Sequence, residues 1–287
     1  AVLGRSRSGA TELFRAAESA LDRAKSPPGF SIAHPSPRRV LWTERIREAL
    51  REDRLGVFAQ PILDLRTDQL DRRELLLRFR ESSRWVGPDR FLHEVERSGL
   101  VVELDLWVLR RALELTGRLP GYVHVNFSGR TLSDPHALER AVGLLQSTPG
   151  AGRLAVEITE TAVLQDLQQA ARFIQALRLA GACVVLDDFG VGYSSLAHLR
   201  HLQVDGFKID GSFVRHMRSN ARDRHLVRSL VEMGHALGCL VIAEWVEDPS
   251  TLQLLREFGA DCAQGFYVAR PAPLPSAARR SAACPAG

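Results

Sequence analysis

The chain has 287 residues, of which 45% are hydrophobic and 25% charged, and its formal net charge is +4. These values are ordinary for a soluble globular protein and exclude a largely disordered chain. The length suffices for one large α/β domain, since an α/β barrel takes roughly 250 residues. The basic residues are spread along the chain and do not cluster with aromatic residues, so we expect no nucleic-acid partner.

We expect neither a membrane anchor nor a leader within this sequence. Because it has no apolar run of about 18 residues, we expect no transmembrane helix, and its start lacks the apolar segment of a signal peptide. Since it begins with Ala1 and not with Met, we expect it to be a fragment or a processed chain. No two cysteines are spaced as CxxC, which argues against a zinc ribbon or a redox pair. We therefore expect Cys183, Cys239 and Cys262 to be buried thiols in a reducing cytoplasm.

The N-terminal segment has its own pattern. Apolar residues recur at helical spacing over 10–25, and the PPG that follows ends this predicted helix. A linker and a second predicted helix over 40–54 come next. We divide the chain into an N-terminal helix and linker over 1–38, a barrel over 39–275 and a flexible C-terminal tail over 276–287.

From residue 57 onward, short apolar runs alternate with longer stretches of helical period. We predict strands at 57–63, 74–79, 122–127, 154–158, 183–186, 206–209, 239–243 and 263–267. About eight strands with helices between them indicate parallel pairing, in a closed barrel or a doubly wound sheet. Polar residues recur at the C-terminal ends of many of these runs, whereas a doubly wound sheet gathers its ligand groups near one switch point. The pattern therefore favours the barrel.

The polar residues near the strand ends are mostly carboxylates and amides. They are Glu74, Asn126, Glu157, Asp187, Asp188, Glu244 and Gln264, and Lys208 lies among them. Unpaired acidic groups buried at one rim would each cost on the order of several kcal/mol, unless a cation neutralised them. Oxygen ligands of this kind select hard divalent ions, so we expect two Mg²⁺ or Mn²⁺ ions, with Ca²⁺ as an inhibitor-like occupant. Such a pair would hold a phosphate oxygen and generate a hydroxide nucleophile.

Residues 55–272, which contain these strands and polar residues, resemble the EAL domain, the cyclic di-GMP phosphodiesterase module of bacteria. The likeness runs in the family's order through QPILDL, ELLLRF, VNFSGRTLSDP, EITET, DDFGVGYSSLAHL, VDGFKIDGSFV, AEWVE and QGFYVARP. The resemblance implies a TIM-like (β/α)8 barrel with one antiparallel strand. It also implies metal-dependent hydrolysis of one phosphodiester of cyclic di-GMP to linear pGpG, in second-messenger signalling.

The resemblance also implies roles for single residues. The positions that match metal ligands are Glu74, Asn126, Glu157, Asp187 and Asp188. The catalytic positions are Glu244 as the proposed general base, Lys208 as the contact of the catalytic water, and Asp188. The positions that match substrate contacts are Gln60, Arg78 and Gln264, and those that match loop anchors are Glu160 and Glu247. A homodimer formed around residues 188–220 is a further implication.

Two residues depart from the family's pattern, and two other functions stay open. Leu75 replaces the Ala of the name-giving motif, and Trp245 replaces the Gly of AEGVE. Neither change removes a ligand, so we expect activity. The alternatives are a receptor module that binds cyclic di-GMP without hydrolysing it, and a scaffold that has lost the ligand.

The segment TELFRAAESALDRAK over 11–25 resembles the last helix of a GGDEF domain, the diguanylate cyclase module that often precedes an EAL domain. This resemblance implies an upstream GGDEF or sensory domain in a longer protein. A remnant this short cannot form a cyclase.

Overall fold

The computed structural model describes residues 37–191 and 202–274. The predicted helix at 10–25, with its likeness to a GGDEF domain, and the C-terminal tail lie outside these residues. Among the described helices, none combines the length and apolar content that a bilayer crossing requires.

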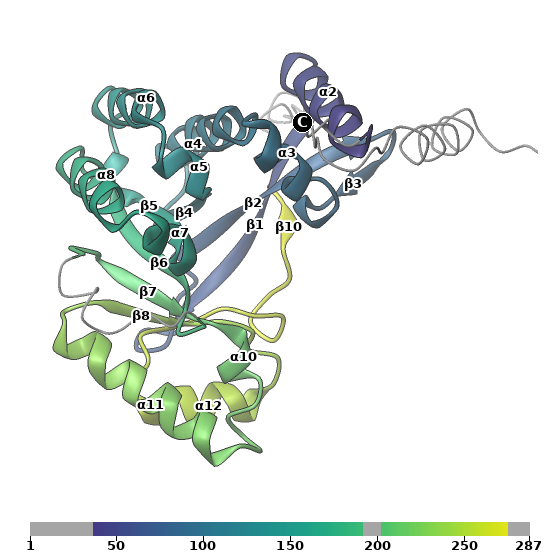
Figure 1. The fold of residues 1–287 in the computed structure, drawn as a ribbon. Coiled ribbons are helices and arrows are strands. Elements are labelled where there is room, and N and C mark those ends of the chain that lie inside the picture. Colours follow the sequence, from purple (N-terminus) through teal and green to yellow (C-terminus); the bar gives the residue numbers. More distant parts are fainter. Residues whose placement is uncertain (1–36, 192–201, 275–287) are drawn as a thin grey trace, which may run out of the picture.

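Eight strands form a closed barrel, as the sequence predicts (Figure 1). Around the barrel the order is β1-β9-β8-β7-β6-β5-β4-β2, and pairing of β1 with β2 closes it. The strands are β1 (Leu55–Asp64), β2 (Arg72–Glu81), β4 (Tyr122–Phe127), β5 (Leu154–Thr159), β6 (Cys183–Phe189), β7 (Gly206–Ile209), β8 (Leu240–Ala243) and β9 (Cys262–Ala263). The short strands β3 (Arg84–Val86) and β10 (Ala272–Pro273) pair with β2 and β1 outside the ring.

One strand of the barrel runs against the others. Strand β1 is antiparallel to both of its barrel neighbours, β2 and β9, whereas the remaining neighbouring pairs are parallel. This confirms the expectation of one antiparallel strand. The predicted last strand, 263–267, is too long, because pairing ends at Ala263 and the chain turns away over the following residues. Gln264 therefore belongs to the loop that leaves the barrel.

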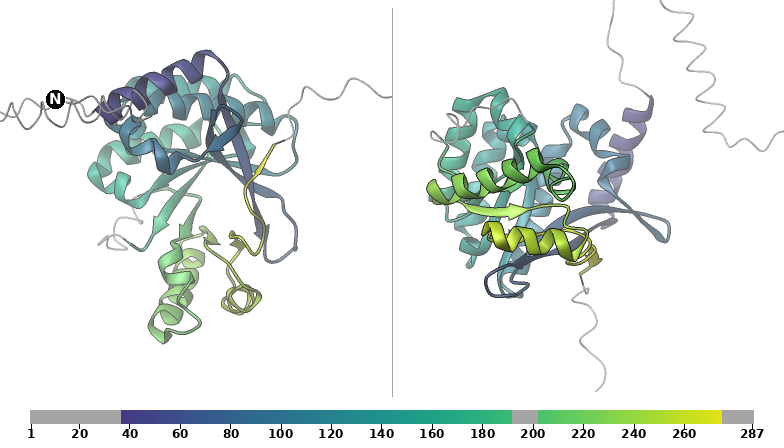
Figure 2. Two further views of the ribbon diagram at one scale, coloured as in Figure 1. Left: turned by 90° about the vertical axis from the view of Figure 1, so that its right-hand side faces the viewer. Right: turned by 90° about the horizontal axis from the view of Figure 1, so that it is seen from below.

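Helices pack on the outside of the ring over the strands from β4 to β8, whereas the short strand β10 lies along β1 (Figures 1 and 2). The described helices are α2 (Pro37–Arg51), α3 (Leu92–Ser98), α4 (Val101–Thr116), α5 (Gly129–Leu132), α6 (Pro135–Gln146), α7 (Glu160–Gln165), α8 (Leu167–Leu179), α10 (Gly211–Val214), α11 (Ala221–Ala236) and α12 (Pro249–Phe258), with 3-10 turns at Pro88–Arg90 and Ala151–Arg153. The predicted helix at 40–54 corresponds to α2, which begins and ends three residues earlier.

The apolar residues alternate between two sides of each strand. On β4, Val123, Val125 and Phe127 belong to the large core between the strands and the helices, whereas the intervening residues face the barrel interior. Leu75 lies in this outer core as well, so the departure from the family's Ala is accommodated away from the interior. A second core joins α2 and α3 to the far ends of β1 and β2. Of the three cysteines expected to be buried, Cys239 and Cys262 are, and Cys183 is half-buried.

Asp105 ties helix α4 to the segment that follows β4. Its Oδ2 accepts hydrogen bonds from Ser128 N at 2.8 Å and from Thr131 Oγ1 at 2.6 Å. Burial raises the pKa of Asp105 from 3.8 to about 6, although these hydrogen bonds pull it down. Because the folded state then holds the proton more tightly than the unfolded chain, this group stabilises the fold fully below its unfolded pKa. That stabilisation is lost as the pH rises through about 6.

We expect Asp105→Asn to remove this pH dependence. Between pH 4 and pH 7, the wild type should lose on the order of 2 kcal/mol relative to the variant, which corresponds to several degrees in Tm. Thermal unfolding of both proteins across that range measures the difference. Glu114→Gln, an exposed carboxylate on the same helix, is the control and should follow the wild-type curve. Parallel curves for wild type and Asp105→Asn would contradict the assignment.

Candidate active site

Lys208 lies at the centre of a ring of carboxylates inside the C-terminal end of the barrel. All four residues of β7 are buried, and Lys208 is 1% exposed. Its Nζ lies 2.7 Å from Glu244 Oε1, 3.0 Å from Glu157 Oε2, 3.2 Å from Glu74 Oε2 and 3.5 Å from Asp187 Oδ1. One ammonium group thus links side chains from β2, β5, β6 and the loop after β8.

Two amides complete the surroundings of Glu74. Asn126 donates from Nδ2 to Glu74 Oε1 at 2.6 Å, and Gln264 donates from Nε2 to Glu74 Oε2 at 2.7 Å. The amide oxygen of Gln264, Oε1, is buried and, among the described residues, has no hydrogen-bond partner. Both amides therefore offer an oxygen as well as a donor at the same rim.

Asp187 and Asp188 reach the same side because the strand is irregular there. Consecutive residues of a regular strand point to opposite faces. Between Leu186 and Phe189 the register of β6 against β7 shifts, and Asp188 has a left-handed backbone with φ 53°. Carboxylate oxygens of Asp187, Asp188 and Glu244 consequently lie within 4.8 Å of one another. Such a bulge re-aims side chains at sheet ends, often next to active sites.

The carboxylates carry more negative charge than Lys208 compensates. Burial, together with the charges of Asp187 and Glu74, raises the pKa of Glu244 to about 8 despite Lys208. Burial, together with the charges of Asp187 and Asp210, likewise raises the pKa of Asp188 to about 6. Burial opposes the charge on Lys208, but its acidic neighbours raise the pKa of Lys208 well above the ordinary value. The lysine thus stays charged among groups that favour an additional cation.

The donor set fits a hard divalent ion. Carboxylate and amide oxygens are the ligands of Mg²⁺ and Mn²⁺, and soft sulfur ligands are missing from this cluster of described residues. The close group formed by Asp187, Asp188 and Glu244 is the part of the site with oxygens already near enough to share an ion.

His124 belongs to the site, although the sequence analysis missed it. It is fully buried, and its Nδ1 lies 2.7 Å from Glu157 Oε1. Burial, followed by the charges of Lys208 and Arg72, lowers the pKa of His124 to about 3, so the ring is neutral and its Nδ1 shares a hydrogen bond with Glu157 Oε1. The signal in the sequence was the alternation of β4, which puts His124 on the same face as Asn126.

Some of the predicted site residues lie at the margin. Gln60 pairs with Glu74 across the β1–β2 ladder, but its amide donates to Ala269 O at 3.3 Å. Arg78 lies four residues beyond Glu74 on β2, with its guanidinium carbon 5.1 Å from the Phe58 ring centroid.

The two predicted loop anchors differ in their surroundings. Glu160 Oε2 accepts from Gly190 N at 2.9 Å, directly after Asp188 and Phe189. Glu247 is exposed in the loop after β8.

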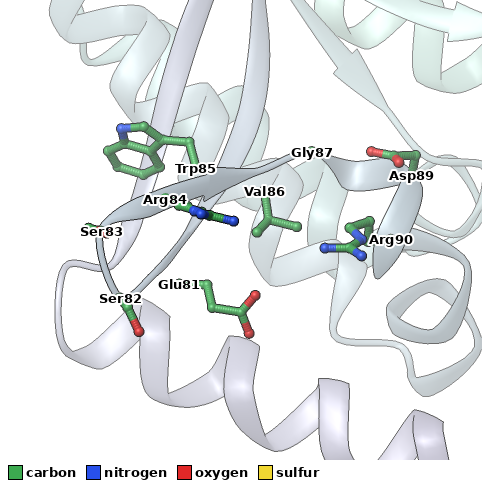
Figure 3. A pocket seen from close by; sticks show the side chains of 9 residues that line it. All are labelled: Glu81, Ser82, Ser83, Arg84, Trp85, Val86, Gly87, Asp89 and Arg90. Carbon is green, nitrogen blue, oxygen red and sulfur yellow. The ribbon is translucent and has the colours of Figure 1, made fainter.

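A separate hollow of about 450 Å³ lies at the β2–β3 hairpin (Figure 3). Residues of a single stretch line it, with Glu81 and Asp89 beside Arg84 and Arg90. It lies seven residues along β2 from Glu74, which is roughly 20 Å of strand. Because one local hairpin forms its wall and its charges are mixed, the acidic rim is the better candidate for an active site.

A known protein family matches this chain over most of its length. The model of the EAL domain matches residues 43–271 of the chain. This chain belongs to the EAL family. NbdA of Pseudomonas aeruginosa, a cyclic di-GMP phosphodiesterase, is 38% identical over 245 residues, which are 80% of this chain and 30% of NbdA. PdeB of Shewanella oneidensis, named for the same activity, is 34% identical over 243 residues, which are 82% of this chain and 28% of PdeB.

Solved EAL structures have the same fold. The FimX EAL domain of Pseudomonas aeruginosa, bound to c-di-GMP, superimposes with a TM-score of 0.76 at 28% identity, over 80% of this chain and 96% of that chain. The PaMucR phosphodiesterase, in its c-di-GMP complex, gives a TM-score of 0.75 at 26% identity, over 81% of this chain and 98% of that chain. The chain thus spans a whole EAL domain but less than a third of the length of NbdA and PdeB.

We expect His124 to be needed for metal binding through its hydrogen bond to Glu157. Removing a group that orients a metal ligand typically weakens metal affinity 10- to 100-fold, so His124→Leu should weaken Mn²⁺ binding by about that factor. His124→Asn keeps a hydrogen-bonding amide near the position of Nδ1 and should retain most of the affinity. Calorimetric titration of substrate-free protein with Mn²⁺ measures both variants. Equal affinities for wild type and His124→Leu would contradict this role.

Proposed function

We propose that the chain is a metal-dependent phosphodiesterase that hydrolyses one phosphodiester of cyclic di-GMP to linear pGpG. The observation that supports it is the gathering of Glu74, Glu157, Asp187 and Glu244 around the buried ammonium of Lys208. This arrangement lies in an EAL domain whose relatives include proteins named cyclic di-GMP phosphodiesterases.

In this proposal Glu74, Asn126, Glu157, Asp187 and Asp188 hold Mg²⁺ or Mn²⁺. Their oxygens are of the right kind, and burial of Glu74 and Glu157 favours a partner of opposite charge. A bound divalent ion neutralises phosphate charge and lowers the pKa of water at the site. Ca²⁺, which prefers a larger and looser shell, would occupy the site without supporting the same geometry.

Lys208 and Glu244 are the proposed pair that handles the attacking water. Glu244 accepts a proton from the attacking water while the oxygen of that water bonds to phosphorus. The bond from phosphorus to the leaving 3′ oxygen breaks. The leaving oxygen then takes up a proton, so one water is consumed and pGpG carries a free 5′ phosphate. The raised pKa of Glu244 suits this role, because a base with a pKa near the working pH accepts a proton effectively. Lys208, 2.7 Å away, holds the carboxylate in place.

Substrate recognition is proposed to use Gln60, Arg78 and Gln264 around the rim. Glu160 would hold the DDFG segment through Gly190, and Glu247 would support the loop after β8. We also propose that the domain works as part of a longer protein and pairs with a second copy near residues 188–220. The larger length of NbdA and PdeB supports the first of these points.

Incubation of the chain with cyclic di-GMP and Mg²⁺ or Mn²⁺, followed by chromatography, tests the proposed reaction. We expect pGpG as the product and loss of turnover in excess chelator, because the acidic rim would lose its cation. Turnover should return when Mn²⁺ is added back. Binding of cyclic di-GMP without cleavage would favour a receptor module instead, and undiminished turnover in chelator would remove the metal from the proposal.

Glu244→Gln should lower kcat by about 10²- to 10⁴-fold, the usual contribution of a general base. Binding of cyclic di-GMP should change only a few-fold, since the amide keeps the shape of the side chain. Glu257→Gln, on the exposed side of α12, is the matched control and should turn over like the wild type. Equal turnover in Glu244→Gln and the control would show that another group accepts the proton.

A further inference from the structure

Trp245 has an unusual backbone next to the proposed base. It directly follows Glu244, and its φ of 55° puts it in the left-handed region. For an L-residue other than glycine this conformation costs roughly 1–2 kcal/mol. Such a residue persists when its surroundings determine its position, and such positions cluster at functional sites. The contacts that hold Trp245 in this conformation therefore bear on the function of the site.

The indole lies on Gly211, at the start of α10. A Cβ added at Gly211 would come within 2.0 Å of Trp245 Cδ1 and 2.3 Å of Cγ, so only glycine leaves room for the ring. The guanidinium carbon of Arg215 lies 4.4 Å from the ring centroid, and Arg215 Nε donates to Gly211 O at 3.3 Å. We call Gly211, Trp245 and Arg215 the tryptophan stack.

The backbone is fixed on both sides of this stack. Glu244 N donates to Ile209 O of β7 at 3.2 Å, and Val246 N donates to Gln264 O at 3.0 Å. Strand pairing of β8 ends at Ala243, so Glu244 lies beyond the regular ladder. The stack thus joins the loop that carries Glu244 to the segment after β7, the strand that carries Lys208.

We propose that the tryptophan stack is a positioning device that holds Glu244 against Lys208. Trp245 itself touches no reacting atom in this proposal. It fixes the peptide that carries Glu244, so that the carboxylate keeps its 2.7 Å contact with Lys208 Nζ. The catalytic consequence rests on the proposed phosphodiesterase function, whereas the restraint on the loop does not.

Because the indole is 45% exposed, a direct contact with a substrate base is the rival explanation. An aromatic face that stacks on a base contributes about 1–3 kcal/mol to binding, so its removal would raise KM. A positioning residue would instead lower kcat with little change in KM. These two signatures separate the explanations.

The chain contains a matched control for the stack. Trp85 lies over Gly56 in the same manner, with an added Cβ at Gly56 coming within 2.7 Å of Trp85 Cη2, and Arg80 lies 6.0 Å from its ring. Trp85 is 42% exposed and pairs with Arg80, six residues along β2 from Glu74, which is roughly 20 Å of strand.

The test compares Trp245→Gly, Gly211→Ala, the double variant and Trp85→Gly. Hydrogen exchange of substrate-free protein reports on the segment 240–247, and turnover of cyclic di-GMP gives kcat and KM. We expect Trp245→Gly to speed exchange in this segment about tenfold and to lower kcat about 5- to 20-fold, with KM within twofold. Gly211→Ala should act similarly, because the new methyl group displaces the indole.

The double variant is the decisive one. Once the indole is absent, the methyl group added at position 211 has nothing to displace, so the double variant should exchange and turn over like Trp245→Gly alone. Trp85→Gly should leave both readouts at wild-type values. Additive effects of the two substitutions, a raised KM with unchanged kcat, or unchanged exchange in Trp245→Gly would each overturn the inference. A wild type that fails to cleave cyclic di-GMP would end the proposed function, and the exchange rates would still decide whether the stack restrains the loop.

Discussion

The ion-pair cluster of Lys208 is the interaction on which the site depends. Its Nζ lies within 3.5 Å of four carboxylates, and the lysine is almost completely buried. At an effective dielectric constant of about 20, each contact near 3 Å is worth on the order of 5 kcal/mol, and removal of each charge from water costs several kcal/mol. The net contribution of the cluster to the stability of the fold is therefore small, and its sign depends on the balance of charge. Lys208 keeps the carboxylates together, and their excess charge leaves the cluster responsive to a further cation.

The barrel brings these side chains together from distant parts of the sequence. Parallel pairing places the ends of β4, β5, β6, β7 and β8 at one rim, so Asn126, Glu157, Asp187, Lys208 and Glu244 become neighbours. Glu74 joins them from the third residue of β2, which pairs with His124, the third residue of β4. The antiparallel strand β1 closes the ring beside Glu74 through the Gln60 pairing.

Much of this was readable in the sequence, for a physical reason. Buried parallel strands are continuous apolar runs, so the bounds of β4 and β7 were predicted as observed. The last strand was predicted too long, because Gln264, Phe266 and Tyr267 continue a strand-like composition after pairing has ended. The short strands β3 and β10 lie outside the ring and carry no periodic signal. His124 was missed because it lies between Val123 and Val125 in an apolar run, although those valines point to the opposite side of the strand. The strand bulge at Asp187 and Asp188 was not predicted, because it depends on pairing with the neighbouring strand rather than on local composition.

The left-handed residues Asp188 and Trp245 show how the rim departs from regular structure. Each directly follows a carboxylate that contacts Lys208, Asp187 in one case and Glu244 in the other. At Asp188 this conformation belongs to the strand bulge, after which Phe189 pairs with Ile209, and at Trp245 it lies just beyond the end of β8. Glycine would adopt the left-handed conformation with little strain, yet both positions carry a side chain that makes contacts. The Asp188 carboxylate joins the acidic cluster, and the Trp245 indole packs on Gly211. Strain of roughly 1–2 kcal/mol at each of these two positions is thus offset by contacts that a glycine could not make, next to carboxylates that contact Lys208.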